Sequence, residues 1–248
     1  YSLDKVENPE QFYITAKAFG RFAYDLNDFD ASQLVEVIPQ FHDTRNRYRQ
    51  LEEAIREDRV GRVKEVQEEI AFIQNRKADC FLLYDLLDEG VLPLRVTHND
   101  TKLNNIMFDS ETKEPLCIVD LDTVMPGLVL FDFGDSIRFG ANDCAEDEPD
   151  LSKVNFDFDL YEIYVKGFIE GTNGILTEAE LEYLPWGARV ITLEQGIRFL
   201  TDYINGDVYY ATTRPGQNLD RARTQLKLVQ DMENVWDKMV EAVKNAQK

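Results

Sequence analysis

Cysteine is scarce in this sequence. The 248 residues contain three widely spaced cysteines, Cys80, Cys117 and Cys144, and no Cys-x-x-Cys pair. The sequence therefore indicates neither a zinc site nor a disulfide framework. No apolar run approaches the roughly 18 residues of a transmembrane helix, and no signal peptide is visible. We expect a protein of the reducing cytoplasm without a membrane partner.

Basic residues are also few relative to acidic ones. Lys and Arg total 27 and Asp and Glu total 47, which gives a formal net charge of -20. Such a chain repels phosphate backbones, so we expect no nucleic-acid partner. An anionic small ligand would need a metal ion or a local basic patch to bind. The composition carries no signal for an oligomeric state.

Helical periodicity dominates both ends of the chain. A helix is expected from Pro9 to about Leu26, with Asn8 as its N-cap and Gln11 closing a capping box. Further helical patterns cover 45–88, with a break at Gly61, and then 157–171, 177–183, 187–204 and 219–246. Short apolar runs at 94–98, 105–109 and 116–120 predict strands, the last two as a hairpin. The predicted fold class is α+β, mainly helical, with a small β-hairpin.

The stretch "VTHNDTKLNNIMFD", residues 96–109, carries the main functional signal. His98, Asp100 and Asn105 follow the H-x-D-x-x-x-x-N pattern of a phosphotransferase catalytic loop. The Asp can orient a substrate hydroxyl and take its proton, and the Asn can offer an amide oxygen to Mg²⁺. His98 is a candidate catalytic residue, with shaping of the loop through backbone hydrogen bonds as its other interpretation. Lys102 and Asn104 are open to interpretation as solvated turn residues.

The predicted hairpin supplies a second metal ligand. Each five-residue strand spans roughly 17 Å, so the chain leaves along 105–109 and returns along 116–120 to its starting level. Asp120 is therefore expected near Asn105, as a carboxylate ligand to Mg²⁺. Asp122 points to the same side if the chain stays extended, and is then a further direct or water-mediated metal ligand.

A second motif competes for the metal role. Asp132-Phe133-Gly134 spells the magnesium motif of protein kinases, but it begins 27 residues after Asn105, whereas Asp120 follows Asn105 by 15. We therefore assign the metal to Asp120. Asp132 is expected near the site in a structural role, either capping a helix that starts there or pairing with a basic group beneath the catalytic loop.

The motifs together resemble a known superfamily. "THNDTKLNNIMFD", "CIVDLDTVMPG" and "LFDFGD" are similar to the aminoglycoside/choline kinase superfamily, whose members share the protein-kinase-like fold. The stretch is most similar to bacterial N-acetylhexosamine 1-kinases, and "IPQFHDT" and the closing helical region extend the likeness over nearly the whole chain. The resemblance implies transfer of phosphate from ATP, with Mg²⁺, to the anomeric hydroxyl of N-acetylglucosamine or N-acetylgalactosamine. It also implies Asp100 as the catalytic Asp and Asn105 and Asp120 as metal ligands.

The same resemblance implies sugar-binding residues. The family draws an Arg and a Tyr from the helical region after the hairpin, and Arg198 and Tyr209 are the best matches, with Trp236 as a further aromatic candidate. The alternative for Arg198 is a surface ion pair with Glu194 or Asp202, both at helical i±4 spacing.

The sequence departs from the family in what it lacks. No G-x-G-x-x-G occurs, and only the seven residues "YSLDKVE" precede the helix start at its N-cap Asn8. We therefore expect residues 1–248 to be the C-terminal, catalytic and substrate lobe, with the N-terminal nucleotide lobe absent and activity of the isolated chain in doubt.

Two alternative functions stay open. One is a kinase of another small alcohol, of the aminoglycoside, choline or homoserine type, and the negative charge would suit a cationic acceptor such as an aminoglycoside or choline. The other is a non-catalytic sugar-binding pseudokinase. A sulfatase is excluded because no C/S-x-P-x-R stretch exists.

Overall fold

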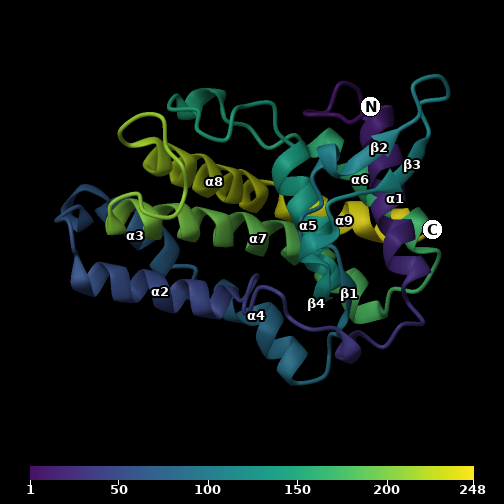
Figure 1. Ribbon diagram of the computed structural model, residues 1–248, viewed down its shortest axis with the longest axis horizontal. Coiled ribbons are helices and arrows are strands. Elements are labelled where there is room, and N and C mark those ends of the chain that lie inside the picture. The colour runs from purple at the N-terminus through teal and green to yellow at the C-terminus, as the bar shows by residue number, and fades with distance from the viewer.

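Nine α-helices and two small sheets make up the fold in the computed structural model, which describes residues 1–248 (Figure 1). This confirms the predicted mainly helical α+β class. In Figure 1, α2, α3 and the ends of α7 and α8 lie toward one side, α1, α6 and the β2–β3 hairpin lie toward the other, and α5 lies between them. The helices are α1 Pro9–Asp25, α2 Thr44–Glu57, α3 Gln67–Gln74, α4 Lys77–Asp88, α5 Val129–Gly140, α6 Phe158–Thr172, α7 Glu178–Asn205, α8 Gln217–Asn234 and α9 Trp236–Ala246.

The strands form two antiparallel pairs. They are β1 Arg95–Thr97, β2 Ile106–Phe108, β3 Pro115–Ile118 and β4 Met125–Gly127, with five short 3₁₀ turns elsewhere. β2 and β3 form the predicted hairpin, with Ile106 opposite Ile118. β4 pairs with β1, Val96 facing Pro126, and was missed because "MPG" has no strand pattern of its own. The prediction that a β-rich nucleotide lobe lies outside these residues stays a prediction.

Several helix boundaries differ from the sequence expectation for physical reasons. Asn8 caps α1 by accepting the Gln11 amide at 2.9 Å, but the Gln11 side-chain oxygen has no partner, so the capping box does not close. α7 continues through Pro185, which is buried within the helix, instead of breaking there. The last helical segment is in turn divided at Val235 into α8 and α9.

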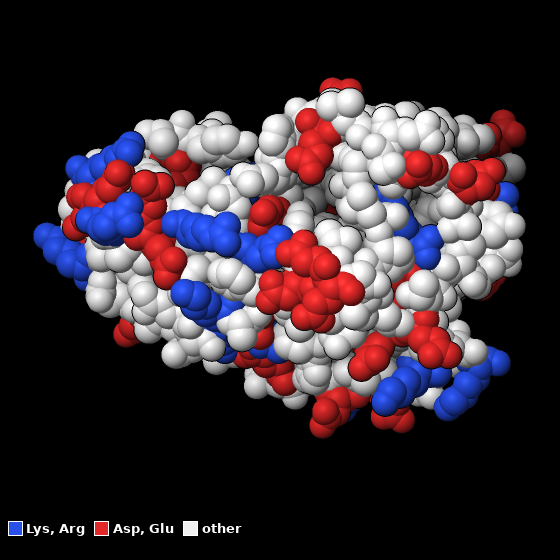
Figure 2. All heavy atoms as spheres, turned by 90° about the horizontal axis from the view of Figure 1, so that it is seen from below, with Lys and Arg blue, Asp and Glu red and all other residues white.

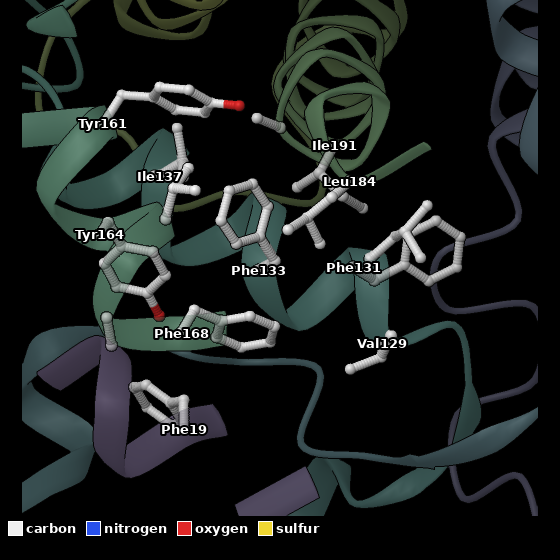
Figure 3. Close-up of a cluster of buried hydrophobic side chains, with 14 of the residues drawn as sticks. Phe19, Val129, Phe131, Phe133, Ile137, Tyr161, Tyr164, Phe168, Leu184 and Ile191 are labelled. Carbon is white, nitrogen blue, oxygen red and sulfur yellow. The ribbon is translucent and has the colours of Figure 1, made fainter. Parts of the chain in front are cut away.

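Two hydrophobic clusters meet along α7. The larger joins α1, α5, α6 and α9 to the first half of α7, and Phe133 of α5 lies among Tyr161, Tyr164 and Phe168 of α6 (Figure 3). The smaller joins α2, α3, α4 and α8 to the second half of α7. α5 and α7 cross closely: a Cβ at Gly187 would lie 2.2 Å from the Leu130 carbonyl oxygen. Only glycine permits this approach. The contact fixes the position of α5, the helix that contacts the loop between β1 and β2.

The surface mixes both signs of charge despite the acidic composition. On the face in Figure 2, acidic side chains lie beside basic ones over most of the surface, and one compact acidic group lies near the middle. Short ion pairs such as Lys17–Glu170 at 2.6 Å follow from this mixing. None of the helices is at once long and apolar enough to cross a bilayer.

Candidate active site

The predicted catalytic loop, residues 98–105, connects β1 to β2. Asn99 has a left-handed backbone with φ 64°, so the chain turns sharply directly before Asp100. The Asn99 side chain holds this turn: its Nδ2 donates to the carbonyls of Thr97 and Thr123, and its Oδ1 accepts from the Thr97 hydroxyl. Asparagine tolerates the left-handed region better than most residues do. The local sequence thus favours the bend that presents Asp100.

Side chains of helix α5 hold the backbone of this loop through hydrogen bonds. The Asp132 carboxylate, 3% exposed, accepts the amides of His98 at 2.8 Å and Asn99 at 2.7 Å. One turn later, Asp135 accepts the Thr101 amide at 3.1 Å, and the Ser136 hydroxyl donates to the Thr101 carbonyl at 2.7 Å. The "FDFGDS" stretch therefore serves as a platform for the backbone around Asp100.

This geometry corrects both roles expected for Asp132. α5 begins at Val129 with Leu128 as N-cap, so Asp132 lies inside the helix and does not cap it. Its partners are main-chain amides rather than a basic group. Burial raises the pKa of Asp132 to about 6, although the neighbouring histidine and amides favour the ionised form.

Asp135 lies one turn along in a different electrostatic setting. Burial alone would raise its pKa, but Arg138, at 2.9 Å, together with His42 and Lys102, outweighs that effect, and the pKa of Asp135 is lowered. α5 thus presents two buried carboxylates to the loop, of which Asp135 is the one held ionised by an arginine.

His98 is enclosed and fully bonded. Its side chain is 0% exposed, its Nε2 donates to the Val119 carbonyl at 3.0 Å, and its Nδ1 accepts the Asp100 amide at 3.3 Å. The edges of Phe19 and Phe22 pack against its ring, each with a centroid distance of 5.8 Å. Both ring nitrogens are occupied, which favours the loop-shaping interpretation of His98 over a catalytic one.

Asp100 is half-buried and has a partner at each carboxylate oxygen. Lys102 Nζ lies 2.7 Å from Oδ1, and Asn105 Nδ2 donates to Oδ2 at 3.2 Å and to the Asp100 carbonyl at 2.8 Å. Lys102 therefore does more than occupy a solvated turn. Because the Asn105 amide nitrogen faces Asp100, its Oδ1 stays free to bind a ligand.

The hairpin returns the chain to Asn105 as the sequence predicts. The Val119 amide donates to the Asn105 carbonyl at 2.9 Å, and Asp120 follows directly. Asp120 is exposed, has φ 61°, and its carboxylate accepts no hydrogen bond and makes no ion pair. Asp122 lies in a 3₁₀ turn, Leu121–Thr123, so the chain does not stay extended and the condition under which Asp122 would point to the side of Asp120 is not met.

The donor chemistry here fits Mg²⁺. Asn105 Oδ1 and the Asp120 carboxylate are hard oxygen donors without protein partners, held close by the hairpin. No group of three or more His, Cys, Asp or Glu side chains forms a metal cage anywhere in the structure. Magnesium keeps several waters and is commonly held by one or two carboxylates plus substrate phosphates, which suits such a sparse donor set.

A cavity of about 440 Å³ opens beside Asp100. Arg198 of α7 lines it too, and the Arg198 guanidinium lies 5.6 Å from each of the Phe41 and Tyr210 ring centroids. Arg221 of α8 also lines the cavity. The cavity therefore combines the half-buried Asp100 carboxylate with three guanidinium groups, the third being that of Arg138, and with aromatic walls.

The ion-pair alternative for Arg198 is not realised. Arg198 donates to Gln195 Oε1 at 3.1 Å. Glu194 is bonded to other groups of the core, and Asp202 accepts the main-chain amides of residues 208–210. Arg198 is thus left to face the cavity.

The two aromatic candidates do not line the Asp100 cavity. Tyr209 is 73% exposed and lines a neighbouring cavity of about 370 Å³, which also includes Arg198. The adjacent Tyr210 is the tyrosine on the Asp100 cavity. Trp236 packs against Trp186 with a centroid distance of 4.9 Å, and the Arg189 guanidinium lies over both rings. Trp236 therefore contacts the core and lies off the cavity.

Residues 3–162 match the model of the phosphotransferase enzyme family (APH). The chain belongs to this family. Among solved structures it is similar to choline kinase from Cryptosporidium parvum Iowa II, with a TM-score of 0.54 and 13% identity over 99% of this chain and 73% of that chain. At this identity the likeness shows the kinase-like fold alone. The family match supports a phosphotransferase, and the likeness is consistent with a kinase-like fold.

Three residues of this phosphotransferase were missed as site residues by sequence reasoning. Lys102 was left open as a turn residue, although its position two after Asp100 was a usable signal. Asp135 lies in the same stretch as Asp132 and could have been found by i+3 spacing. Tyr210 was passed over for its neighbour, because the loop after α7 has no periodicity that tells which tyrosine faces inward.

Proposed function

We propose that this phosphotransferase transfers the γ-phosphoryl group of ATP to the anomeric hydroxyl of N-acetylglucosamine or N-acetylgalactosamine. The observation that carries the proposal is the shared cavity: Asp100, predicted as the catalytic residue, and Arg198, which the resemblance implies as a sugar-binding residue, line the same 440 Å³ space. A monosaccharide fits within such a volume, since small-molecule sites commonly range from roughly 300 to 1,000 Å³.

Each polar group then has a role. Asp100 accepts a hydrogen bond from the acceptor hydroxyl, orients it, and takes its proton as the phosphoryl group transfers. Asn105 Oδ1 and Asp120 would hold Mg²⁺, which offsets charge on the transferring phosphate. Lys102, bonded to Asp100 Oδ1 at 2.7 Å, holds the carboxylate in its orientation.

The charge distribution around the cavity favours a neutral acceptor over a cationic one. Its acidic lining residues all have basic partners: Asp100 pairs with Lys102, Asp135 and Glu146 with Arg138, and Glu194 with His42. Arg198 and Arg221 bond neutral amide or carbonyl oxygens instead. A cation such as choline or an aminoglycoside would face these guanidinium groups, whereas a sugar can accept their hydrogen bonds through its oxygens.

The test is product identification with the full-length protein. N-acetylglucosamine, N-acetylgalactosamine, choline and kanamycin are each incubated with ATP and Mg²⁺, and the products are followed by ³¹P NMR. A sugar 1-phosphate is expected, recognised by coupling of phosphorus to the anomeric proton. The Asp100→Asn variant is the matched control for background ATP hydrolysis.

Two outcomes would reject the proposal. Faster phosphorylation of choline or kanamycin than of either N-acetylhexosamine would identify a kinase of cationic alcohols. Sugar binding measured by calorimetry with no product under any condition would identify a non-catalytic sugar-binding protein, despite the intact Asp100, Asn105 and Asp120.

A further inference from the structure

His42 lies in the connector before α2, far in sequence from the catalytic loop, and has no role in the mechanism above. It is 8% exposed and packs against Phe41 and Phe131. Its Nε2 lies 3.1 Å from the Asn99 carbonyl oxygen, and its Nδ1 lies 3.1 Å from Glu194 Oε1. His42 therefore joins α7 to the residue before Asp100.

The two histidines of the chain hold the two sides of one peptide bond. The carbonyl of the Asn99–Asp100 peptide accepts from His42, while the amide of the same peptide donates to His98. The orientation of this peptide sets the direction in which the Asp100 side chain leaves the backbone. The left-handed Asn99 just before it makes the segment dependent on such outside support.

The partners of His42 also define its protonation. A carbonyl oxygen accepts only, so Nε2 carries a proton. Glu194 Oε2 accepts the Thr44 hydroxyl at 2.8 Å and Glu194 Oε1 faces Nδ1. Although burial alone would raise it, the pKa of Glu194 is lowered by His42 and its other partners, so the carboxylate is ionised and also only accepts. Both ring nitrogens then carry protons, and His42 is an imidazolium paired with Glu194.

We propose that the His42–Glu194 ion pair is a positioning device that holds the Asn99–Asp100 peptide in its catalytic orientation and links it to the acceptor cavity. Arg198 lies four residues after Glu194 on α7, hence on the same face of that helix, and lines the cavity together with both members of the pair. An acceptor bound at Arg198 therefore contacts the helix that also anchors the loop. The catalytic part of this inference rests on the proposed function.

The experiment compares His42→Gln and Glu194→Gln with Asp79→Asn in the full-length protein. Asp79 pairs with Arg189 between α4 and α7, away from the loop, so its variant controls for loss of a partly buried ion pair. We expect kcat to fall at least about tenfold in both pair variants, because a small misplacement of a catalytic group is costly. The KM for ATP should stay unchanged, and Asp79→Asn should lower thermal stability with wild-type kcat.

A second measurement is independent of substrate. In protein labelled with ¹⁵N-histidine, the His42 ring, assigned by its loss in His42→Gln, should show two protonated nitrogens at pH 7, and one in Glu194→Gln. A single protonated nitrogen in the wild type would overturn the inference whatever the acceptor proves to be. Wild-type kcat in His42→Gln, with only a lowered melting temperature, would equally reduce the pair to a structural contact. If N-acetylhexosamines are not substrates, the same kcat comparison is made with the alcohol that is.

Discussion

Asp132 and Asp120, two carboxylates of one site, differ in burial and in hydrogen bonding. Asp132, beneath the catalytic loop, is 3% exposed and accepts two main-chain amides at 2.8 and 2.7 Å. Asp120, at the end of the hairpin, is exposed and its carboxylate has no partner. Main-chain amides of the fold donate hydrogen bonds to the Asp132 carboxylate. The Asp120 carboxylate receives none and remains available to a ligand. In the proposed mechanism, the group that orients Asp100 is thus fixed in advance, and the group that would bind a cation is kept free.

Asp100 lies on the loop between the Asp132 region and the Asp120 region, and its substitution should have the largest effect on turnover. Asp100→Asn keeps the size of the side chain but removes the acceptor for the substrate proton, so turnover should fall by roughly 10²- to 10⁴-fold. Steady-state kinetics of the full-length protein measure this, with circular dichroism melting as the check on folding. Activity within a few-fold of the wild type would show that Asp100 is not the base.

Asp120→Ala tests the free carboxylate. Loss of this oxygen donor should lower turnover by roughly 10²-fold or more and raise the Mg²⁺ concentration needed for half-maximal activity. The melting temperature should hardly change, because the carboxylate bonds nothing in the protein. An Asp120 variant with wild-type activity and Mg²⁺ dependence would mean that the metal is held elsewhere.

Asp132→Ala tests the hydrogen-bonded carboxylate and should have the opposite effects: lower stability and an unchanged Mg²⁺ dependence. Removing it leaves the amides of His98 and Asn99 buried without an acceptor, which should cost about 1–3 kcal/mol of unfolding free energy. Turnover should fall because the loop loosens, but the Mg²⁺ dependence should match the wild type. Chemical denaturation and Mg²⁺ titration of the two variants side by side measure this. A stable Asp132 variant that needs far more Mg²⁺ would reverse the two assignments.

The sequence predicted the exposed region of the site better than the enclosed one. Asn105 and Asp120 are brought together by a hairpin whose strands are local and apolar, so strand geometry alone was enough. The partners of Asp132 are backbone amides 33 and 34 residues earlier, which no side-chain pattern reports. The contact of His42 with Asn99 likewise depends on how α5 and α7 pack.

The same distinction explains the errors in the fold. Helices with their own caps and periodicity were placed correctly, as α1 shows. α7 runs through Pro185 because tertiary packing against α5 overrides local propensity. β4 exists because β1 offers a partner.

A smaller effect is expected at the cavity wall. Tyr210→Ala removes an aromatic wall beside Arg198 and should raise the KM for the acceptor about tenfold, the equivalent of roughly 1.4 kcal/mol. Tyr209→Ala, one residue away and 73% exposed, is the matched control and should change the KM little. Kinetics with the acceptor varied at saturating ATP distinguish them. A larger effect at Tyr209 would restore the original sequence assignment.

The smallest effect concerns pH and extends the comparison to a third kind of group, a buried pair of opposite charge. Burial on its own would lower the pKa of His42, but Glu194 more than offsets it, and the pKa is raised. Burial would likewise raise the pKa of Glu194, but His42 lowers it overall. The charged groups that act on the ring are Glu194 of α7 and Asp132 and Asp135 of α5, and Arg198 of α7 acts in turn on Glu194.

A raised folded-state pKa means that the His42 contribution is complete below its unfolded pKa of about 6.5 and is lost as the pH rises through the folded value. The Glu194 contribution is present above its unfolded pKa of about 4.3 and is lost only as the pH falls through the lowered folded value. The stability advantage of the wild type over His42→Gln should therefore shrink from pH 7 toward pH 10, a range in which Asp132, with its pKa of about 6, is already ionised. Melting temperatures of both proteins across this range measure the gap. A gap that stays constant or widens with pH would mean that His42 is not charged in the folded protein, and the imidazolium assignment would fail.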